Sequence, residues 1–242
     1  LIQASKMATL GEMATGVAHE LNQPLSVIKT ASRFFMKKIR NKEKIKDDIL
    51  LTMSEEIDTY VDRATKIINH MRQFGRKSDV TLEKVQVNLT MEKALQILGQ
   101  QLKVRGIEVV REFEQDLPPV MADPDRLEQV FINLLINARD AIDERWQDQP
   151  HQSGDKKITL KTTSNAETVT AEVHDTGTGI PAPILDRIFE PFFTTKKVGQ
   201  GTGLGLSISY GIIQDCNGSI QAVSRKDEGT GFIIKFPVAE DN

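Results

Sequence analysis

Apolar side chains recur at alternating steps of three and four through the first third of the chain. The first series consists of Met7, Leu10, Ala14, Val17, Leu21, Pro24, Ile28, Ala31 and Phe35. The second series consists of Leu50, Met53, Ile57, Tyr60, Ala64, Ile67, Met71 and Phe74. This spacing is typical of the a and d positions of a coiled coil or helical bundle. Because the polar segment 40–48 separates the two series, they predict an antiparallel helical hairpin.

Each predicted helix carries only one narrow apolar stripe, so one hairpin alone cannot build a stable core. Two hairpins that pair into a four-helix bundle bury these stripes together. We therefore expect residues 1–76 to form a dimerisation domain and the chain to be a homodimer.

The pattern changes after residues 77–85, a polar segment that we interpret as a linker. Helical periodicity then covers residues 89–103, 124–145 and 203–216. Alternating, β-branched segments cover residues 107–113, 157–163, 168–174, 218–224 and 231–238. This mixture predicts a second domain over residues 86–242, an α/β sandwich with helices on one face of a mixed sheet.

Composition narrows the function classes. A formal net charge of −3 over 242 residues gives no reason to expect a nucleic-acid partner. No apolar run reaches the roughly 18 residues that a membrane span needs, so we expect no membrane segment in this chain. A lone cysteine, Cys216, excludes an internal disulfide and suits a reducing compartment.

His19 occupies an outward heptad position in the first series. Counting Leu21 as position a places His19 at f, farthest from the seam, so its imidazole should face solvent. Glu20 lies beside it and Gln23 one turn further on, while Pro24 should loosen the helix just after the histidine. By itself, an exposed His-Glu pair is more often an ordinary solvated surface. A zinc-protease motif is excluded, because Gln23 stands where HExxH has its second histidine.

Two polar motifs lie in the predicted sandwich. In EQVFINLLINARDAI, residues 128–142, Asn133 and Asn137 are one turn apart on a nearly apolar helix, and an amide oxygen suits Mg²⁺. In HDTGTGIP, residues 174–181, Asp175 ends a strand, and Gly177 and Gly179 allow a tight turn around a ligand. A carboxylate accepts a hydrogen bond from the exocyclic amine of adenine, whereas guanine has a carbonyl there. Asp175 would therefore prefer ATP over GTP, although a D-x-G-x-G string by itself can also be an ordinary turn.

A glycine-rich segment follows. IFEPFFTTK, residues 188–196, leads into GQGTGLGLSIS, residues 199–209, which continues into an apolar helix. Exposed backbone N–H groups at the start of such a helix bind phosphate. The segment matches neither a Walker loop nor the dinucleotide-binding G-x-G-x-x-G motif.

Together with MATGVAHELNQPLSVI, these motifs resemble the H, N, G1, F and G2 boxes of sensor histidine kinases of two-component systems. HELNQP and NARDA are similar to the nitrogen-regulation and dicarboxylate-sensing branch. The resemblance implies a Bergerat-type fold for the second domain. It also implies that His19 is phosphorylated, that Glu20 acts as base or orienter of the imidazole, and that Gln23 positions water for dephosphorylating the regulator.

In the nucleotide domain, the resemblance implies a ligand set. Asn137 would bind Mg²⁺, Asn133 would support the phosphates and Asp175 would bind adenine. The residues that would shape the adenine pocket are Gly177, Gly179 and Thr230, and those that would cradle phosphate are Gly201, Thr202, Gly203, Leu204 and Gly205. Phe189 and Phe193 would anchor a lid that carries Lys196 and Lys197. Many members of the family have a lysine where this chain has Asp140, and we expect Arg139 to supply that charge.

The resulting prediction is an enzyme that uses ATP and Mg²⁺ to phosphorylate its own His19 and passes the phosphoryl group to an aspartate of a response regulator receiver domain. We expect the reaction on the cytoplasmic side, in a parent protein that is either soluble or membrane-anchored. Two alternatives stay open. A Bergerat-type ATPase clamp explains the nucleotide motifs but not His19, and it lacks the usual glutamate at position 133. A non-catalytic dimerisation scaffold is the other.

Overall fold

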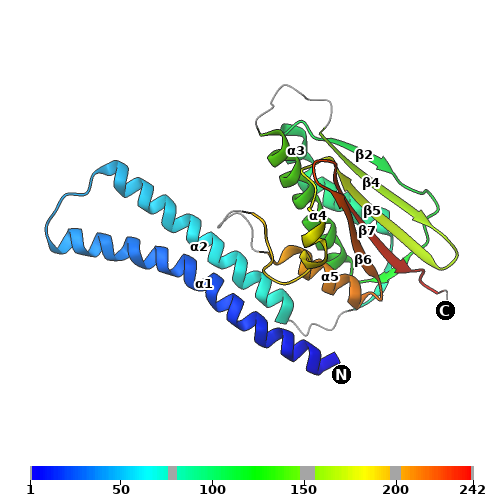
Figure 1. Ribbon diagram of the computed structural model, residues 1–242, viewed down its shortest axis with the longest axis horizontal. Helices are drawn as coiled ribbons and strands as arrows, with labels where there is room; N and C mark the ends of the chain where they lie inside the picture. The colour runs from blue at the N-terminus through cyan, green and yellow to red at the C-terminus, as the bar shows by residue number, and fades with distance from the viewer. Residues whose placement is uncertain (1, 76–80, 148–155, 197–202, 241–242) are drawn as a thin grey trace. The chain divides into compact units, whose positions relative to one another are not determined.

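The computed structural model describes residues 2–75, 81–147, 156–196 and 203–240 (Figure 1). The chain divides into two compact units. One comprises the helices before residue 78, and the other contains a sheet and covers residues 78–193 and 203–242. Each unit is considered by itself.

The first unit is a helical hairpin of α1, Ile2–Arg40, and α2, Asp47–Gly75. The predicted seam is the less exposed side of both helices. On α1, Pro24 and Ala31 are buried, and on α2 Ile67 is buried. α1 continues through Pro24 without a break. The predicted hairpin is therefore confirmed.

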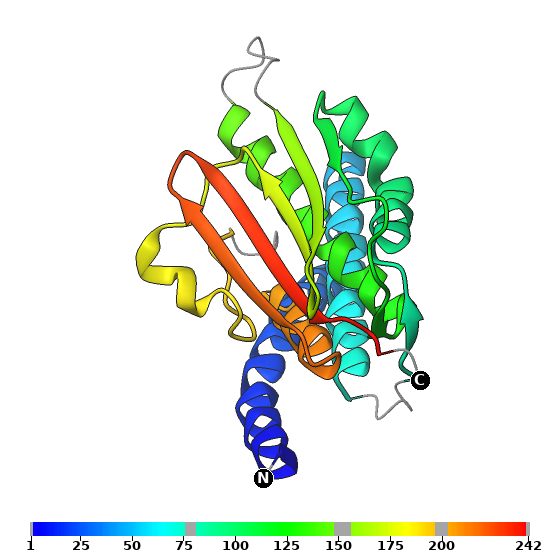
Figure 2. The same cartoon turned by 90° about the vertical axis from the view of Figure 1, so that its right-hand side faces the viewer.

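The second unit is a five-stranded mixed sheet with three helices on one face (Figures 1 and 2). The strand order is β2 (Glu108–Glu112), β4 (Lys157–Ser164), β5 (Thr168–Asp175), β7 (Gly229–Pro237) and β6 (Ser219–Arg225). Only β2 and β4 are parallel to each other. The helices are α3 (Val87–Val104), α4 (Pro124–Trp146) and α5 (Gly205–Asp215). α4 packs against both α3 and α5.

Strand alternation sets which side chains enter the core. Along β5, Val169, Ala171 and Val173 are buried against the helices, whereas the residues between them are partly exposed. The same alternation places Asp175, the last residue of the strand, on the buried side. A carboxyl group therefore ends a row of apolar side chains.

Some short elements were not predicted from the sequence. β1 (Glu83–Val85) and β3 (Val120–Ala122) form a separate antiparallel pair, and a 3₁₀ helix, η1, spans Ala182–Arg187. β1 lies in the last three residues of the segment interpreted as a linker. Three residues are too few to establish a period of two, so these strands had no sequence signal. Within the described ranges, no helix is both long and apolar enough to cross a bilayer.

Candidate nucleotide and phosphoacceptor sites

One face of α4 organises the candidate nucleotide site. Asn133, Asn137, Ala141 and Arg145 follow one another at steps of four, which places them along one side of the helix. The buried apolar side of α4 includes Phe131, Leu134, Leu135 and Ala138. This stripe, which we call the polar stripe although it includes Ala141, therefore runs along the edge of the core, where its side chains contact other elements.

Asn133 ties α4 to the start of α5. Its Nδ2 donates to the Gly205 carbonyl at 3.3 Å and to Ser209 Oγ at 3.4 Å. Ser209 Oγ also donates to the Gly205 carbonyl, at 3.0 Å. This amide thus positions the first turn of α5, which follows the glycine-rich segment.

The Asn137 side chain is half-buried and makes no hydrogen bond to any residue that the structure describes. A partly buried amide without a protein partner is suited to a ligand. Its oxygen is a hard donor of the kind Mg²⁺ takes, and Mg²⁺ at phosphates commonly uses only one or two protein ligands. Asn137 therefore fits the predicted metal ligand.

Asp175 is only 8% exposed at the end of β5. Its Oδ1 accepts hydrogen bonds from the backbone N–H of Gly177 at 2.7 Å and of Thr230 at 3.3 Å. Among the described residues, none donates to Oδ2. One oxygen thus fixes the carboxyl group, and the other can accept a hydrogen bond from a ligand.

Burial has the largest effect on the pKa of Asp175. Removal from water raises the pKa of Asp175 to about 6, although the N–H groups of Gly177 and Thr230, then His174 and Arg145, act to lower it. A carboxyl group with a pKa near 6 changes charge close to neutral pH. Perturbed groups of this kind are concentrated at functional sites.

The turn after Asp175 requires glycine at two positions. A Cβ at Gly177 would lie 2.5 Å from Cβ of Ala141, so the backbone approaches α4 too closely for any side chain. Gly179 has φ +69°, and a Cβ there would lie 2.0 Å from the Arg225 carbonyl oxygen. The predicted tight turn therefore packs between α4 and the β6–β7 hairpin.

Thr230 is buried beside this turn, and its hydroxyl lies 2.9 Å from Ser224 Oγ. Ser224 Oγ also accepts from the Ile180 N–H at 2.7 Å and donates to the Gly229 carbonyl at 2.8 Å. Ser224 was not predicted as a site residue. Its only sequence signal is its position in the strand opposite Thr230.

The start of α5 presents backbone donors. Leu204 precedes the helix and provides no side-chain cap, so among the described residues the N-cap side chain leaves the N–H groups of the first turn, from Gly205 onward, available to a ligand. Gly203 packs against the backbone of Phe192, where a Cβ would lie 2.3 Å from the Phe192 carbonyl carbon. This geometry suits an anion at the helix N-terminus.

Two aromatic contacts lie before the glycine-rich segment. The rings of Phe189 and Tyr210 are 5.6 Å apart, and the Arg187 guanidinium lies 4.6 Å from the Phe193 ring. Lys196 donates its backbone N–H to Thr194 Oγ1. The other predicted residues of this segment, Lys197, Gly201 and Thr202, lie outside the described residues.

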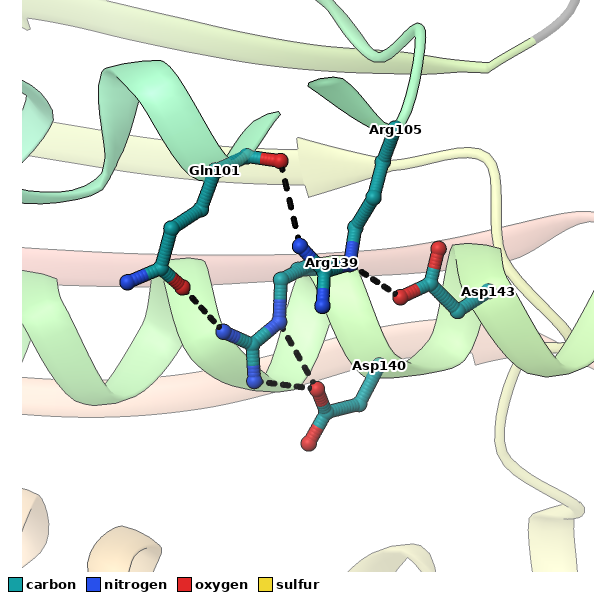
Figure 3. A network of polar contacts seen from close by, with 5 residues as sticks. All are labelled: Gln101, Arg105, Arg139, Asp140 and Asp143. Carbon is teal, nitrogen blue, oxygen red and sulfur yellow. Dashed lines mark hydrogen bonds and ion pairs between the residues drawn. The ribbon is translucent and has the colours of Figure 1, made fainter. Parts of the chain in front are cut away.

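Arg139 points towards Gln101 of α3 and towards Asp140 (Figure 3). Its guanidinium donates to Asp140 Oδ1 at 2.6 and 2.9 Å and to Gln101 Oε1 of α3 at 2.8 Å. Two residues along an α-helix turn by about 200°, so Arg139 points away from the face of Asn137. The assignment of Arg139 as the source of positive charge at the phosphates stays a prediction, and its contacts here are with α3 and Asp140. Its contacts join α4 to α3, next to an ion pair between Arg105 and Asp143.

The predicted phosphoacceptor residues lie on α1. His19 and Glu20 belong to that helix, and their side chains lie outside what the structure describes. Gln23 is partly exposed, and its Oε1 accepts a hydrogen bond from Arg63 Nη2 of α2 at 3.3 Å. The Gln23 amide is thereby oriented by the neighbouring helix.

The sequence matches two family profiles. Residues 9–79 match the His Kinase A (phospho-acceptor) domain, and residues 122–240 match the Histidine kinase-, DNA gyrase B-, and HSP90-like ATPase family. The two-component sensor PprA of Pseudomonas aeruginosa is 39% identical over 241 residues, which cover 99% of this chain and 25% of PprA. The sensor histidine kinase ZraS of Escherichia coli is 32% identical over 96% of this chain and 46% of ZraS. The chain thus spans a quarter to about half the length of these curated relatives.

Solved structures give the same fold. The catalytic domain of histidine kinase ThkA is 31% identical and matches with a TM-score of 0.54 over 65% of this chain and 95% of that domain. A crystal structure of ThkA in complex with the response regulator protein TrrA is 24% identical and has a TM-score of 0.72, over 98% of this chain and 64% of ThkA. The predicted fold class, a helical hairpin followed by a Bergerat-type sandwich with a mixed sheet, is confirmed.

Proposed function

The chain belongs to the sensor histidine kinases, and from that premise we propose that it transfers the γ-phosphoryl group of ATP to His19 and then to an aspartate of a response regulator. One observation carries the proposal: a single face of α4 presents the Asn137 amide and holds the turn that fixes Asp175. A ligand that meets both must have a hydrogen-bond donor at one end and an anionic, metal-binding group at the other. ATP has both.

Nucleotide binding uses groups with separate tasks. Asp175 Oδ2 accepts a hydrogen bond from the adenine amine, and Thr230 lines the same pocket. The backbone N–H groups that begin α5 meet the phosphates, and Asn133 holds that turn in place. Asn137 would hold Mg²⁺, which would offset negative charge on the phosphate oxygens. The resemblance assigns Lys196 and Lys197 to a lid, and their charges would then act on the triphosphate.

The transfer itself is a displacement at the γ-phosphorus. A lone pair of the neutral His19 imidazole forms the N–P bond, and the bond from the γ-phosphorus to the bridging oxygen breaks, so ADP leaves with that electron pair. Glu20 stabilises the positive charge that arises on the ring, and any ring proton that Glu20 accepts returns to the imidazole when the phosphoryl group leaves. The phosphohistidine then passes its phosphoryl group to a carboxylate of the receiver domain, which regenerates neutral His19.

The protein partners follow from the same proposal. PprA is named a two-component sensor, and we extend that role to this chain, with a separate or linked receiver domain as acceptor. Apolar residues that the hairpin leaves exposed, including Leu25, Leu51 and Val61, favour pairing with a second copy. We place the reaction in the cytoplasm, where ATP and receiver domains occur.

Gln23 distinguishes two reactions, dephosphorylation of the regulator and autophosphorylation of His19. We propose that its amide orients the water that hydrolyses the phosphorylated regulator, with Arg63 fixing the amide through Oε1. Gln23→Ala is then expected to abolish phosphatase activity and to keep autophosphorylation of His19. Equal loss of both activities would contradict this assignment.

The central test is incubation of the purified chain with γ-labelled ATP and Mg²⁺. Acid-labile, base-stable label on the wild type is expected to be absent from His19→Ala and from Asp175→Ala. Label that survives His19→Ala would move the phosphoacceptor elsewhere. Release of phosphate without any labelled protein would favour an ATPase clamp, and binding without turnover would favour a scaffold.

A further inference from the structure

We propose that Arg145 is a positioning residue that holds the turn after Asp175 in the geometry that recognises adenine. The inference rests on the proposed function, because it takes Asp175 as the adenine-binding group. Arg145 is the last of the four residues on the polar stripe of α4, one helical turn after Ala141.

Arg145 makes two hydrogen bonds to consecutive carbonyl groups of the turn. Its Nη1 donates to the Thr176 carbonyl at 2.9 Å and to the Gly177 carbonyl at 3.2 Å. Hydrogen bonds from a charged donor are stronger than those between neutral groups. These two bonds tie the turn after β5 to the end of α4.

A second contact with α4 lies beside these bonds. The Thr178 N–H donates to the Ala141 carbonyl at 3.2 Å, and Gly177 packs directly on Ala141. The backbone on both sides of Gly177 is therefore fixed to α4. The Gly177 N–H in turn donates to Asp175 Oδ1 at 2.7 Å. A displacement of the turn would rotate the carboxyl group and redirect Oδ2.

The Arg145 side chain is itself supported. Its guanidinium carbon lies 5.4 Å from the ring centroid of Trp146, and that ring is buried. A planar cation over an aromatic face is an attractive contact. Lysine at position 145 could donate to the two carbonyls but would lack the planar stacking, so it should restore part of the function.

Arg145 lies on the adenine side of the site and contacts no group assigned to the phosphates. Its removal should therefore weaken the binding of ATP more than that of GTP, because GTP does not use the bond to Asp175. It should leave the maximal rate of autophosphorylation unchanged. A role in general stability would instead reduce the fraction of active protein for both nucleotides.

The experiment measures KM and maximal rate of autophosphorylation, and the ATP-to-GTP affinity ratio, for three variants of the full chain. Arg145→Ala is expected to raise KM for ATP and to lower the affinity ratio by about tenfold, with the maximal rate retained. Arg145→Lys is expected to recover part of the ratio. Arg105→Ala, which removes an exposed ion pair with Asp143 on the same helical layer, is the matched control and should behave as the wild type.

An unchanged affinity ratio in Arg145→Ala would overturn the proposal, as would a fall in maximal rate with KM constant. Asp175→Asn is measured in parallel. If Asp175→Asn also keeps the preference for ATP, the adenine assignment itself fails. If Asp175→Asn loses the preference and Arg145→Ala keeps it, only the inference about Arg145 fails.

Discussion

At the scale of single residues, Asp175 combines a cost in folding stability with the proposed binding of adenine. Its carboxyl group closes a row of apolar side chains on β5, and burial raises its pKa to about 6. At neutral pH the ionised group therefore destabilises the folded unit. Raising the pKa of Asp175 from 3.8 to about 6 corresponds to about 3 kcal/mol.

Asp175→Asn is expected to stabilise the protein at neutral pH. The asparagine Oδ1 can keep the bonds from Gly177 and Thr230, while the buried charge is lost. The native pKa exceeds the unfolded one, so the wild type gains stability as the pH falls from about 6 towards 4. The difference in free energy of unfolding should fall from about 3 kcal/mol above pH 7 to below about 1 kcal/mol near pH 4.

Urea unfolding at both pH values measures this difference. Asp186→Asn, at an exposed position of η1, is the matched control and should give the same small difference at each pH. A destabilised Asp175→Asn variant at pH 7.5 would show that the carboxylate has a stabilising partner after all.

The binding of adenine nucleotides should have the opposite pH dependence. The adenine amine donates a hydrogen bond, so it favours the ionised carboxylate and lowers the pKa of Asp175 in the complex. The affinity for an ATP analogue should therefore decrease as the pH falls through about 6. Titration calorimetry on the wild type and Asp175→Asn isolates this effect, because protonation of the nucleotide phosphates is common to both. Parallel pH profiles in the two proteins would contradict it.

Two arginines show what the sequence could and could not predict. Arg139 and Arg145 lie on the same helix, and the sequence points to Arg139 because it neighbours Asp140. Steps of four from Asn137, however, lead through Ala141 to Arg145. The stripe was present in the sequence. That its last member would meet the Thr176 and Gly177 carbonyls depends on the path of the turn, which periodicity does not define.

At the scale of elements, the length of a helix or strand decides whether the sequence predicts it. α4 and β5 were predicted almost to their ends, because several repeats of a period establish a helix or a strand. β1 and β3 are stabilised by each other and by burial of Val85 and Val120. Such pairing between distant segments leaves no local pattern in three residues.

Two glycines offer a comparison between a turn and a helix. Gly179→Ala introduces a Cβ at φ +69° against the Arg225 carbonyl and is expected to destabilise the second unit and abolish nucleotide binding. Gly99→Ala, inside α3 with open space around it, should instead stabilise by up to about 1 kcal/mol through helix propensity. Thermal unfolding distinguishes the two. Equal effects would mean that the turn can relax around a side chain.

At the scale of the whole molecule, the hairpin leaves apolar surface uncovered. Leu50, Ile57, Val61 and Ile68 lie at steps of seven, four and seven along α2, and most are exposed. A stripe of this kind is typical of a helix in a bundle of more than two helices. This pattern supports the expected homodimer.

Val61→Glu is expected to shift the chain from dimer to monomer, because it places a charge within that stripe. Sedimentation equilibrium measures the change. Leu89→Glu is the control, since Leu89 is 64% exposed on α3 in the other unit. Dissociation caused by Leu89→Glu, or a dimer that tolerates Val61→Glu, would place the interface elsewhere.

The polar stripe of α4 also fixes the distance between the groups proposed to recognise the two ends of the ligand. From Asn137 to Arg145 the helix rises about 12 Å, and this spacing cannot stretch or shrink while the backbone hydrogen bonds hold. The groups proposed to recognise the two ends of a nucleotide are thus held at a constant distance by one helix. A single residue inserted into α4 between these positions would turn one end by about 100° relative to the other. Every recognition group would still be present, but no nucleotide could meet them together.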